Sequence, residues 1–381
     1  MTRVAVVSPF PPVRGGISHF AARASDALQA GGHEVVRCSF KRQYPDFLFP
    51  GRSQFESGRA ADPAALIDGM NPFSWMKAGR RLRDSKPDIV LAAYWTPILA
   101  PATGIVAGKA GAPVLALVHN ARPHERLPGG DTLARWFFGR CAGVLTLSNV
   151  VANQVRELGF SGPLRTTPHP VYDRFGDAPA RDDARRQLGL DPEAPVLLFF
   201  GLVRSYKGLD VLIEALAGVR QTAPAALLVV AGEWYEPRGP VARRIAELGL
   251  EDAVVIHDAY VPDESVPALF SAADVVVLPY RSATQSGVLE TAAAYGVPVV
   301  VTDVGALAAP VLEFGSGRVV LPEDAEALAS AILEVIDPEK QPAFRTGALR
   351  LASAHGWTPF VEAFEGLVGE VFGHPHRPES G

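Results

Sequence analysis

Cysteine is almost absent from this sequence. The 381 residues include only two cysteines, Cys38 and Cys141, which lie far apart in the chain. A disulfide framework or a zinc cluster requires several cysteines at short, regular spacings. The sequence therefore excludes a disulfide-stabilised scaffold and a cysteine-based metal centre, and we expect no metal site.

Long apolar runs are also missing. A helix that crosses a bilayer needs about 20 consecutive apolar residues, and the sequence has no such stretch. Residues 1–8 form a short strand-like run without the basic start and long apolar segment of a signal peptide. We expect a cytoplasmic protein, with peripheral attachment at the inner face of the membrane as the alternative.

Two common nucleotide-binding motifs are absent as well. The chain has neither the GxxxxGK(S/T) phosphate loop nor the GxGxxG dinucleotide fingerprint. ATP hydrolysis and dinucleotide binding are therefore not expected. What the sequence does contain is an ordinary globular composition, 48% hydrophobic and 20% charged, in a length typical of two or three domains.

The most informative stretch begins with the apolar run Val196–Phe200, which predicts a buried strand of a parallel sheet. Apolar residues at helical spacing follow over 209–216, and Asp210 is placed to cap this helix. Arg204 and Lys207 lie in the intervening loop. A helix N-terminus beside two cations suits an anion, because unpaired N–H groups and full charges converge there. The alternative is that both cations are solvated loop charges.

A second polar turn precedes a later helix. Gln285, Ser286 and Gly287 come before a helix expected to start near Val288, and its N-terminus is a second candidate anion site. Glu290, one turn into that helix, is placed to accept hydrogen bonds from ribose hydroxyls. Two anion sites and a diol acceptor describe a nucleoside diphosphate, whereas a favourable N-terminal helix charge is the alternative role of Glu290.

Two N-terminal segments add further candidates. Gly15 and Gly16 lie in a proline-rich loop between the first strand and a helix, where they allow close approach of the backbone to a phosphate or sugar. His119 follows the apolar run 113–118, at the carboxyl end of a strand, where open α/β sheets bind ligands. This histidine can donate a hydrogen bond, act as an acid or base, or simply cap the strand.

Charge divides the chain into two parts. Residues 1–175 contain 21 Lys and Arg against 12 Asp and Glu, a net charge of +9, whereas residues 176–381 contain 15 against 29, a net charge of −14. Opposite signs suggest two domains with different partners, or two domains that attract each other. The helix expected over 72–83 places four basic residues among apolar ones, a pattern typical of helices on anionic membranes and, more often, of a solvated helix face.

Alternating apolar runs and helical patterns predict an α/β fold with two doubly wound parallel-sheet domains facing a cleft. The first covers residues 1–173 and the second residues 174–355. The polar stretch 169–195 is expected to be a linker. Helical apolar spacing recurs in the C-terminal stretch, and the polar tail 374–381 is expected to be disordered.

Five segments carry a family resemblance: RGGIS near the N-terminus, LVHN after a strand, HPV at the domain junction, FFGLVRSYKGLDVLIEAL, and SGVLETAAAYGVPVVVTDVGAL. With these segments in this order, the chain resembles the retaining glycosyltransferases of family four (group 1), which have the GT-B architecture of two Rossmann-like domains. The resemblance implies an N-terminal acceptor-binding domain, a C-terminal nucleotide-sugar-binding domain, and a helix over 356–373 that returns to the N-terminal domain.

The resemblance also implies roles for individual residues. His119, Arg204 and Lys207 match catalytic positions, and the last two hold the donor diphosphate. The implied donor-binding set is Gly15, Gly16, Arg204, Lys207, Glu233, Val261, Gln285, Ser286, Gly287, Val288, Leu289 and Glu290. Within it, Val261 contacts the base, Glu290 the ribose, and the backbone of 287–289 a phosphate. The chain departs from the family at Ser282, where a first glutamate is usual, and Gln285 or Ser286 is expected to substitute.

The implied activity is transfer of a sugar, of the hexosyltransferase type, from a nucleoside diphosphate sugar with retention at the anomeric carbon, in glycan, glycolipid or polysaccharide biosynthesis. No metal, other cofactor or nucleic-acid partner is expected. The basic first domain favours a lipid-linked or otherwise anionic acceptor and peripheral contact with an anionic membrane. The alternatives are a nucleotide-sugar epimerase or hydrolase on the same scaffold, and a non-catalytic sugar-nucleotide-binding protein.

Overall fold

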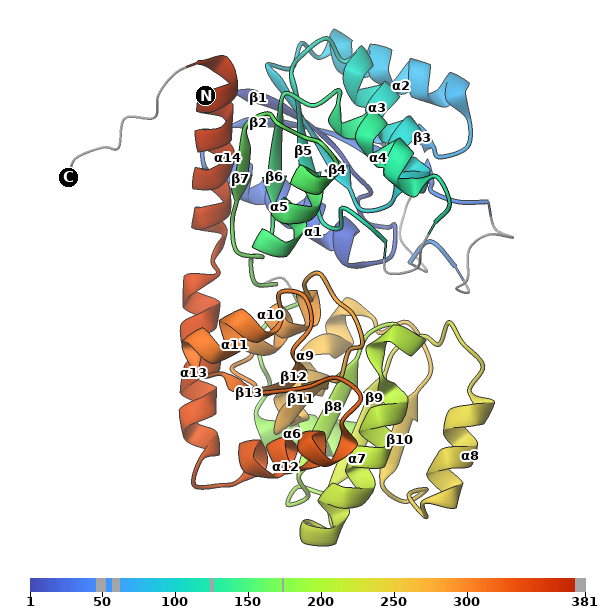
Figure 1. The fold of residues 1–381 in the computed structure, drawn as a ribbon, viewed down its shortest axis with the longest axis vertical. Coiled ribbons are helices and arrows are strands. Elements are labelled where there is room, and N and C mark those ends of the chain that lie inside the picture. Colours follow the sequence, from blue (N-terminus) through green and yellow to red (C-terminus); the bar gives the residue numbers. More distant parts are fainter. Residues whose placement is uncertain (46–52, 57–61, 124–126, 173–174, 374–381) are drawn as a thin grey trace, which may run out of the picture. The chain divides into compact units, whose positions relative to one another are not determined.

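The computed structural model describes residues 1–45, 53–56, 62–123, 127–172 and 175–373. The chain divides into two compact units, one formed by Met1–His169 with the segment from Trp357 onward, and the other by Pro170–Gly356. The division lies a few residues before the expected domain boundary at 173, and the expected tail at 374–381 lies outside the described residues. Each unit is a parallel sheet covered by helices (Figure 1).

The first unit is built on seven parallel strands in the order β3-β2-β1-β4-β5-β6-β7. Its strands are β1 (Arg3–Val7), β2 (Glu34–Arg42), β3 (Ala65–Asp68), β4 (Ile89–Tyr94), β5 (Val114–Val118), β6 (Gly143–Thr146) and β7 (Leu164–Thr166). The order reverses between β1 and β4, which is the doubly wound topology that the alternating pattern predicts.

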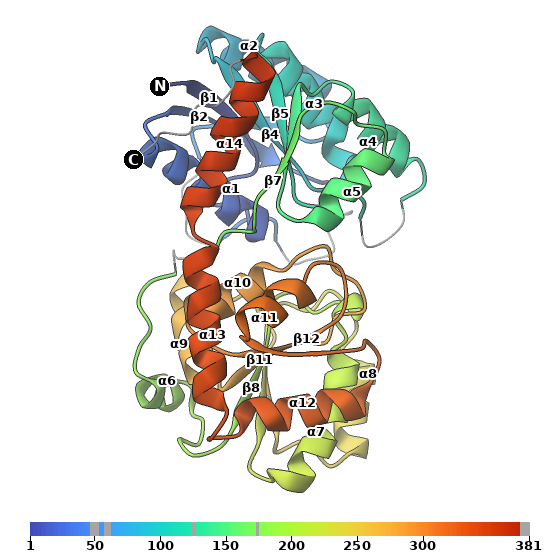
Figure 2. The same cartoon turned by 60° about the vertical axis from the view of Figure 1, so that its left-hand side comes forward.

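Helices cover both faces of this sheet. They are α1 (Gly16–Ala30), α2 (Pro72–Asp84), the short η2 (Pro97–Leu99), α3 (Ala100–Lys109), α4 (Gly130–Phe138), α5 (Asn149–Glu157) and α14 (Trp357–Phe372). Helices α2 to α5 share one buried apolar cluster with alternate strand residues. On the other face, Leu367 of α14 approaches Gly143 of β6, and α1 packs beside α14 (Figure 2). The C-terminal helix is therefore part of the first unit.

The second unit is built on six parallel strands in the order β10-β9-β8-β11-β12-β13. Its strands are β8 (Val196–Phe200), β9 (Leu227–Ala231), β10 (Val254–His257), β11 (Val275–Leu278), β12 (Val299–Thr302) and β13 (Gly317–Val320). Its helices are α6 (Arg181–Leu188), η3 (Ser205–Lys207), α7 (Leu209–Thr222), α8 (Gly239–Glu247), η4 (Asp263–Ser265), α9 (Val266–Ala272), α10 (Gly287–Ala294), α11 (Ala308–Phe314), α12 (Ala325–Ile336) and α13 (Gln341–Ala354).

Strand β8 is central and buried on both faces. Leu197 and Phe199 pack with α7, α8 and α12, whereas Leu198 packs with α6, α9, α10 and α11. This explains why the sequence shows a continuous apolar run here. The strand order reverses between β8 and β11, so the loops that follow these two strands diverge and leave the crevice in which doubly wound sheets bind ligands.

Two local expectations were wrong. The stretch 169–195 is not only a linker, because it contains α6, which packs Ala184 and Arg185 into the second unit with no exposed surface. Its polar composition concealed this, since the buried residue is a charged one. Asp210 does not cap α7: the N-cap is Gly208, and the Asp210 carboxylate pairs with Arg281 instead.

The described part of the chain contains no helix that is both long and apolar enough to cross a membrane.

Candidate functional site

The loop after β8 places a lysine in a buried position. Strand β8 is followed by Gly201, whose φ of +97° strongly favours glycine, and the loop ends in the short turn η3. Lys207, the last residue of η3, is only 8% exposed. Its Nζ atom lies 2.9 Å from the point where a Cβ atom would stand on Gly201. The missing side chain at Gly201 therefore makes room for the ammonium group.

Among the described residues, no acid pairs with Lys207. No carboxylate lies within ion-pair distance of its Nζ in the part of the chain that the structure describes. Burial and, to a lesser extent, the charge of Arg204 together lower the pKa of Lys207 to about 8. The Lys207 ammonium faces the Tyr280 ring at 5.5 Å, and the Arg204 guanidinium lies 5.2 Å from the Tyr235 ring. A buried ammonium close to a second cation is unfavourable unless an anion binds to it.

The loop after β11 fixes the cationic loop in place. Gly208 approaches the carbonyl of Pro279 so closely that a side chain at 208 would collide with it. The backbone N–H of Arg281 donates to the carbonyl of Tyr206 at 2.7 Å, and its guanidinium donates to the carbonyl of Ser205 at 2.6 Å. The same guanidinium binds the Asp210 carboxylate at 2.7 Å. No sequence motif marked Arg281 as a candidate, although it follows a strand end as the other candidates do.

The guanidinium of Arg281 also pairs with Glu323, so it joins three segments of the second unit.

The N-terminus of α10 lies beside Lys207. The Ser286 hydroxyl accepts the N–H of Val288 at 3.2 Å and caps the helix. A Val288 methyl lies 3.8 Å from the same point above Gly201 that Lys207 approaches. Tyr172 packs so closely on Gly287 that a Cβ there would lie 2.6 Å from its ring. The first turn of α10 thus offers backbone N–H groups next to the buried ammonium.

Glu290 lies in this first turn but is deeply buried. It is 4% exposed, and its two carboxylate oxygens lie 3.2 and 3.1 Å from Nδ1 of His355, the residue that follows α13. Burial raises the pKa of the Glu290 carboxyl, and the hydrogen bond with His355 opposes that rise. His355 was not predictable from the sequence, because 65 residues separate the two partners and no local pattern marks the pair.

The remaining candidates of the second unit follow neighbouring strands. Glu233, two residues after β9, is 2% exposed, and its carbonyl accepts the N–H of Val203 at 3.0 Å. Val261 follows β10 and is partly buried against an apolar cluster. Ser282 and Gln285 lie half-buried between β11 and α10. Leu289 is 2% exposed, so its side chain is not available to a ligand.

In the first unit, His119 follows β5 as the sequence predicts. Its N–H donates to the carbonyl of Tyr94 at 2.9 Å, and its ring packs edge-on against Phe20 at 4.9 Å. Phe20 belongs to α1, whose N-cap is Gly15, at a φ of +113°. The structure thereby brings the Gly15–Gly16 loop and His119 to one region of this unit.

The electrostatic state of His119 follows from its position. Burial and, to a lesser extent, His169 together lower the pKa of His119 to about 3. The imidazole is therefore neutral near pH 7, which suits hydrogen bonding better than proton transfer.

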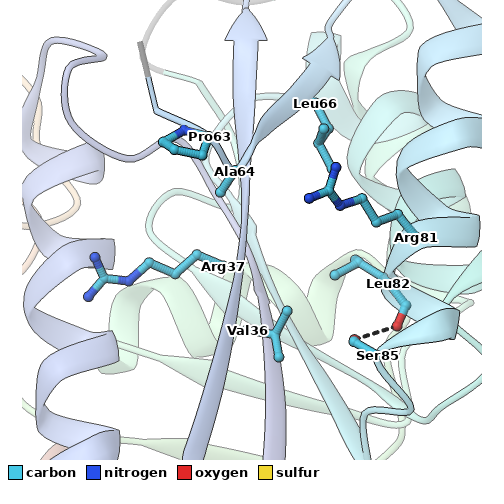
Figure 3. A pocket seen from close by; sticks show the side chains of 8 residues that line it. All are labelled: Val36, Arg37, Pro63, Ala64, Leu66, Arg81, Leu82 and Ser85. Carbon is cyan, nitrogen blue, oxygen red and sulfur yellow. Dashed lines mark hydrogen bonds between the residues drawn. The ribbon is translucent and has the colours of Figure 1, made fainter. Parts of the chain in front are cut away.

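A pocket of about 310 Å³ lies elsewhere in the first unit (Figure 3). It is lined by Val36, Arg37, Pro63, Ala64, Leu66, Arg81, Leu82 and Ser85. Val36 and Arg37 lie in the first half of β2, and Ser85 precedes β4. All strands of a parallel sheet start at the same end of the sheet. This pocket therefore lies toward the amino ends of the strands, whereas His119 lies at a carboxyl end. It contains none of the candidate residues.

Comparison with known proteins agrees with this geometry. A family described as "Glycosyl transferases group 1" matches residues 194–338, and one described as "Glycosyltransferase Family 4" matches residues 14–174. D-inositol 3-phosphate glycosyltransferase 1 of Catenulispora acidiphila is 32% identical over 328 residues, which cover 80% of this chain and 76% of that protein. Glycogen synthase of Mycobacterium tuberculosis is 27% identical over 393 residues, which cover 95% and 93%.

Solved structures share the fold. Sucrose-phosphate synthase from Thermosynechococcus elongatus has a TM-score of 0.75 at 20% identity, covering 98% of this chain and 100% of that one. HepE of Anabaena, in complex with UDP and glucose, has a TM-score of 0.70 at 17% identity, covering 97% and 100%. The two sheets of seven and six parallel strands are those of the GT-B fold. This chain belongs to the group 1 (family 4) glycosyltransferases, enzymes that use nucleotide sugars as donors.

Proposed function

We propose that the chain transfers a sugar from a nucleoside diphosphate sugar with retention at the anomeric carbon and without a metal ion. The observation that carries this proposal is the buried ammonium of Lys207 beside Arg204, with no carboxylate at ion-pair distance from Lys207 in the described chain. A donor diphosphate would supply the negative charge that this position lacks.

The proposed mechanism is electrostatic. As the glycosidic bond breaks, negative charge grows on the leaving diphosphate, and Lys207, Arg204 and the N–H groups at the start of α10 stabilise it. The leaving phosphate oxygen takes the proton of the acceptor hydroxyl, so no protein base is needed. Glu290 accepts the ribose hydroxyls, Val261 contacts the base, and neutral His119 hydrogen-bonds to a sugar hydroxyl.

Recognition of the donor sugar differs from the common family pattern. Ser282 stands where the family usually has a glutamate, so the carboxylate that is usual in the family is absent from this position. We assign this role to Gln285 or Ser286, which lie half-buried just before α10.

An anionic acceptor fits the first unit. Residues 1–175, which include most of the first unit but not its C-terminal helix, carry a net charge of +9, and the relative from Catenulispora acidiphila is named for a phosphorylated polyol. Helix α2 also exposes Phe73 (87%) among basic residues, which favours peripheral contact with an anionic bilayer. Co-sedimentation with vesicles rich in phosphatidylglycerol tests this contact, and binding that is absent, or unchanged by Phe73→Ser, contradicts it.

The donor is tested by thermal unfolding with UDP, GDP, ADP, dTDP and their sugars, because a ligand of the folded state raises Tm. One nucleotide is expected to stabilise the wild type, and Lys207→Ala and Glu290→Ala are expected to abolish that effect. No shift with any nucleotide would overturn the proposal.

Nucleotide release then separates the activities. A transferase releases nucleotide only with an acceptor, a hydrolase releases it without one, and a binding protein releases none. The anomeric proton of the product, observed by NMR, shows retention or inversion.

A further inference from the structure

His355 and Glu290 form a buried pair inside the second unit. His355 is 8% exposed and Glu290 is 4% exposed. Two further contacts hold His355 in place: its ring packs edge-on against Phe314 at 5.7 Å, and its backbone carbonyl accepts the N–H of Val171 at 2.9 Å. The ring position is therefore set by the fold and not by Glu290 alone.

Apolar side chains pack close to this pair. Val171, Ala293 and Leu351 form a small buried cluster at the α10–α13 contact, joined by Phe314. The phenol of Tyr172, which packs on Gly287, is a further titratable group near this helix. A carboxylate in such a place needs a hydrogen-bond donor, since an unsatisfied buried charge is strongly unfavourable.

The ionised form of Glu290 defines which atom donates. A carboxylate only accepts, so the hydrogen lies on Nδ1 and is shared between the two oxygens at 3.1 and 3.2 Å. A shared donor fixes the plane of the carboxylate group. It also leaves other lone pairs on both oxygens for a second partner, and a vicinal diol has two hydroxyls to offer.

We propose that His355 is a positioning residue that holds the Glu290 carboxylate in the orientation required to accept both ribose hydroxyls of the donor. His355 itself does not touch the donor. This inference rests on the proposed nucleotide-sugar function. It adds that the His355–Glu290 pair makes the donor site prefer ribonucleotides over deoxyribonucleotides.

The test uses two variants of the full chain and isothermal titration calorimetry. The ligands are the nucleoside diphosphate that stabilises the wild type and its 2′-deoxy analogue. His355→Leu removes the donor, whereas the amide of His355→Asn places an N–H near the position of Nδ1. We expect the wild type to prefer the ribonucleotide about tenfold, as for loss of one charge-assisted hydrogen bond. His355→Leu loses this preference, and His355→Asn restores most of it.

A matched control exists in the first unit. His33 binds Glu365 at 3.1 Å in a similar pair far along the chain from Glu290, so His33→Leu is expected to leave the preference unchanged. If His355→Leu keeps the ribose preference, the positioning role is wrong while the donor proposal stands. If the wild type binds no nucleotide at all, the donor proposal itself fails, and the inference fails with it.

A second measurement needs no variant that could fold poorly. Long-range ¹H–¹⁵N spectra of the wild type report which imidazole nitrogen carries hydrogen. We expect Nδ1 of His355 to be protonated and its resonance to move when the ribonucleotide binds but less when the deoxy analogue binds. An unprotonated Nδ1, or equal shifts with both ligands, would overturn the proposal.

Discussion

The Nζ atom of Lys207 lies 2.9 Å from the point where a Cβ atom would project from Gly201. Glycine is required at position 201 for two reasons. Its φ of +97° disfavours any side chain, and its missing Cβ leaves space for the ammonium group. The end of β8 thereby sets the position of the charge that we assign to the diphosphate.

Gly201→Ala is therefore expected to weaken nucleotide binding about tenfold or more, because the new methyl group displaces the ammonium from its place. Calorimetric titration measures the change. Gly249→Ala is the matched control: Gly249 also has a positive φ, +64°, but nothing lies within 4 Å of its Cβ position. The control is expected to lose stability, by about 1 kcal/mol, and to bind the nucleotide normally. Unchanged binding in Gly201→Ala would contradict this role of Gly201.

Nucleotide binding is expected to take up a proton above pH 8. The pKa of Lys207 is lowered to about 8 in the free protein, and a bound diphosphate favours the charged form and raises it again. Between the pKa of Lys207 in the free protein and its higher pKa in the complex, the complex holds more protons than the free protein. The affinity for the nucleotide therefore falls as pH rises, by at most about tenfold per pH unit. Below pH 8 this group adds no pH dependence. Calorimetry in buffers of different ionisation enthalpy counts the protons.

Lys207→Arg is the control for this titration, because a guanidinium stays charged over the whole range. It is expected to bind without proton uptake between pH 8 and 10. Equal proton uptake in this variant and the wild type would assign the titration to another group.

Arg281 is expected to support the donor loop without touching the donor. It holds the carbonyl of Ser205 at 2.6 Å and the carboxylate of Asp210 at 2.7 Å, so Arg281→Ala frees the loop that carries Lys207. We expect nucleotide affinity to fall about tenfold, as for loss of one or two charge-assisted hydrogen bonds. Arg244→Ala is the matched control, since Arg244 also pairs with two acids, Glu214 and Glu247, but on the surface of α7 and α8. Equal affinities of the two variants would exclude the support role.

The sequence predicted the features that are encoded locally. The apolar run of β8, the cations after it and the polar turn before α10 are each contained in a short segment, and the structure brings Lys207 and Val288 to the same point above Gly201. The doubly wound topology also followed from local alternation of strand and helix patterns.

The partners that arrive from distant segments were not predictable in this way. His355 meets Glu290 across 65 residues, and Arg281 meets Asp210 across 71. His355 and Arg281 are single polar residues, and no repeating pattern in the sequence around them indicates which residue they contact. Helix α6 was missed for a related reason, because the residue that it buries most completely is Arg185, and composition alone assigns a charged residue to the surface.

The pair formed by Arg185 and Asp274 is expected to be the most sensitive polar contact for stability. Arg185 has no exposed surface, and it donates to the Asp274 carboxylate at 2.6 Å and to the carbonyls of Pro192 and Ala194 at 2.6 and 2.8 Å. Asp274→Ala leaves this guanidinium buried without its counter-ion, so we expect the free energy of unfolding to fall by about 3–5 kcal/mol. Urea denaturation measures the loss. Asp252→Ala, which removes the exposed partner of Arg220, is expected to change it by less than about 1 kcal/mol. Similar losses in the two variants would show that the Arg185–Asp274 contact does not hold α6 against the sheet.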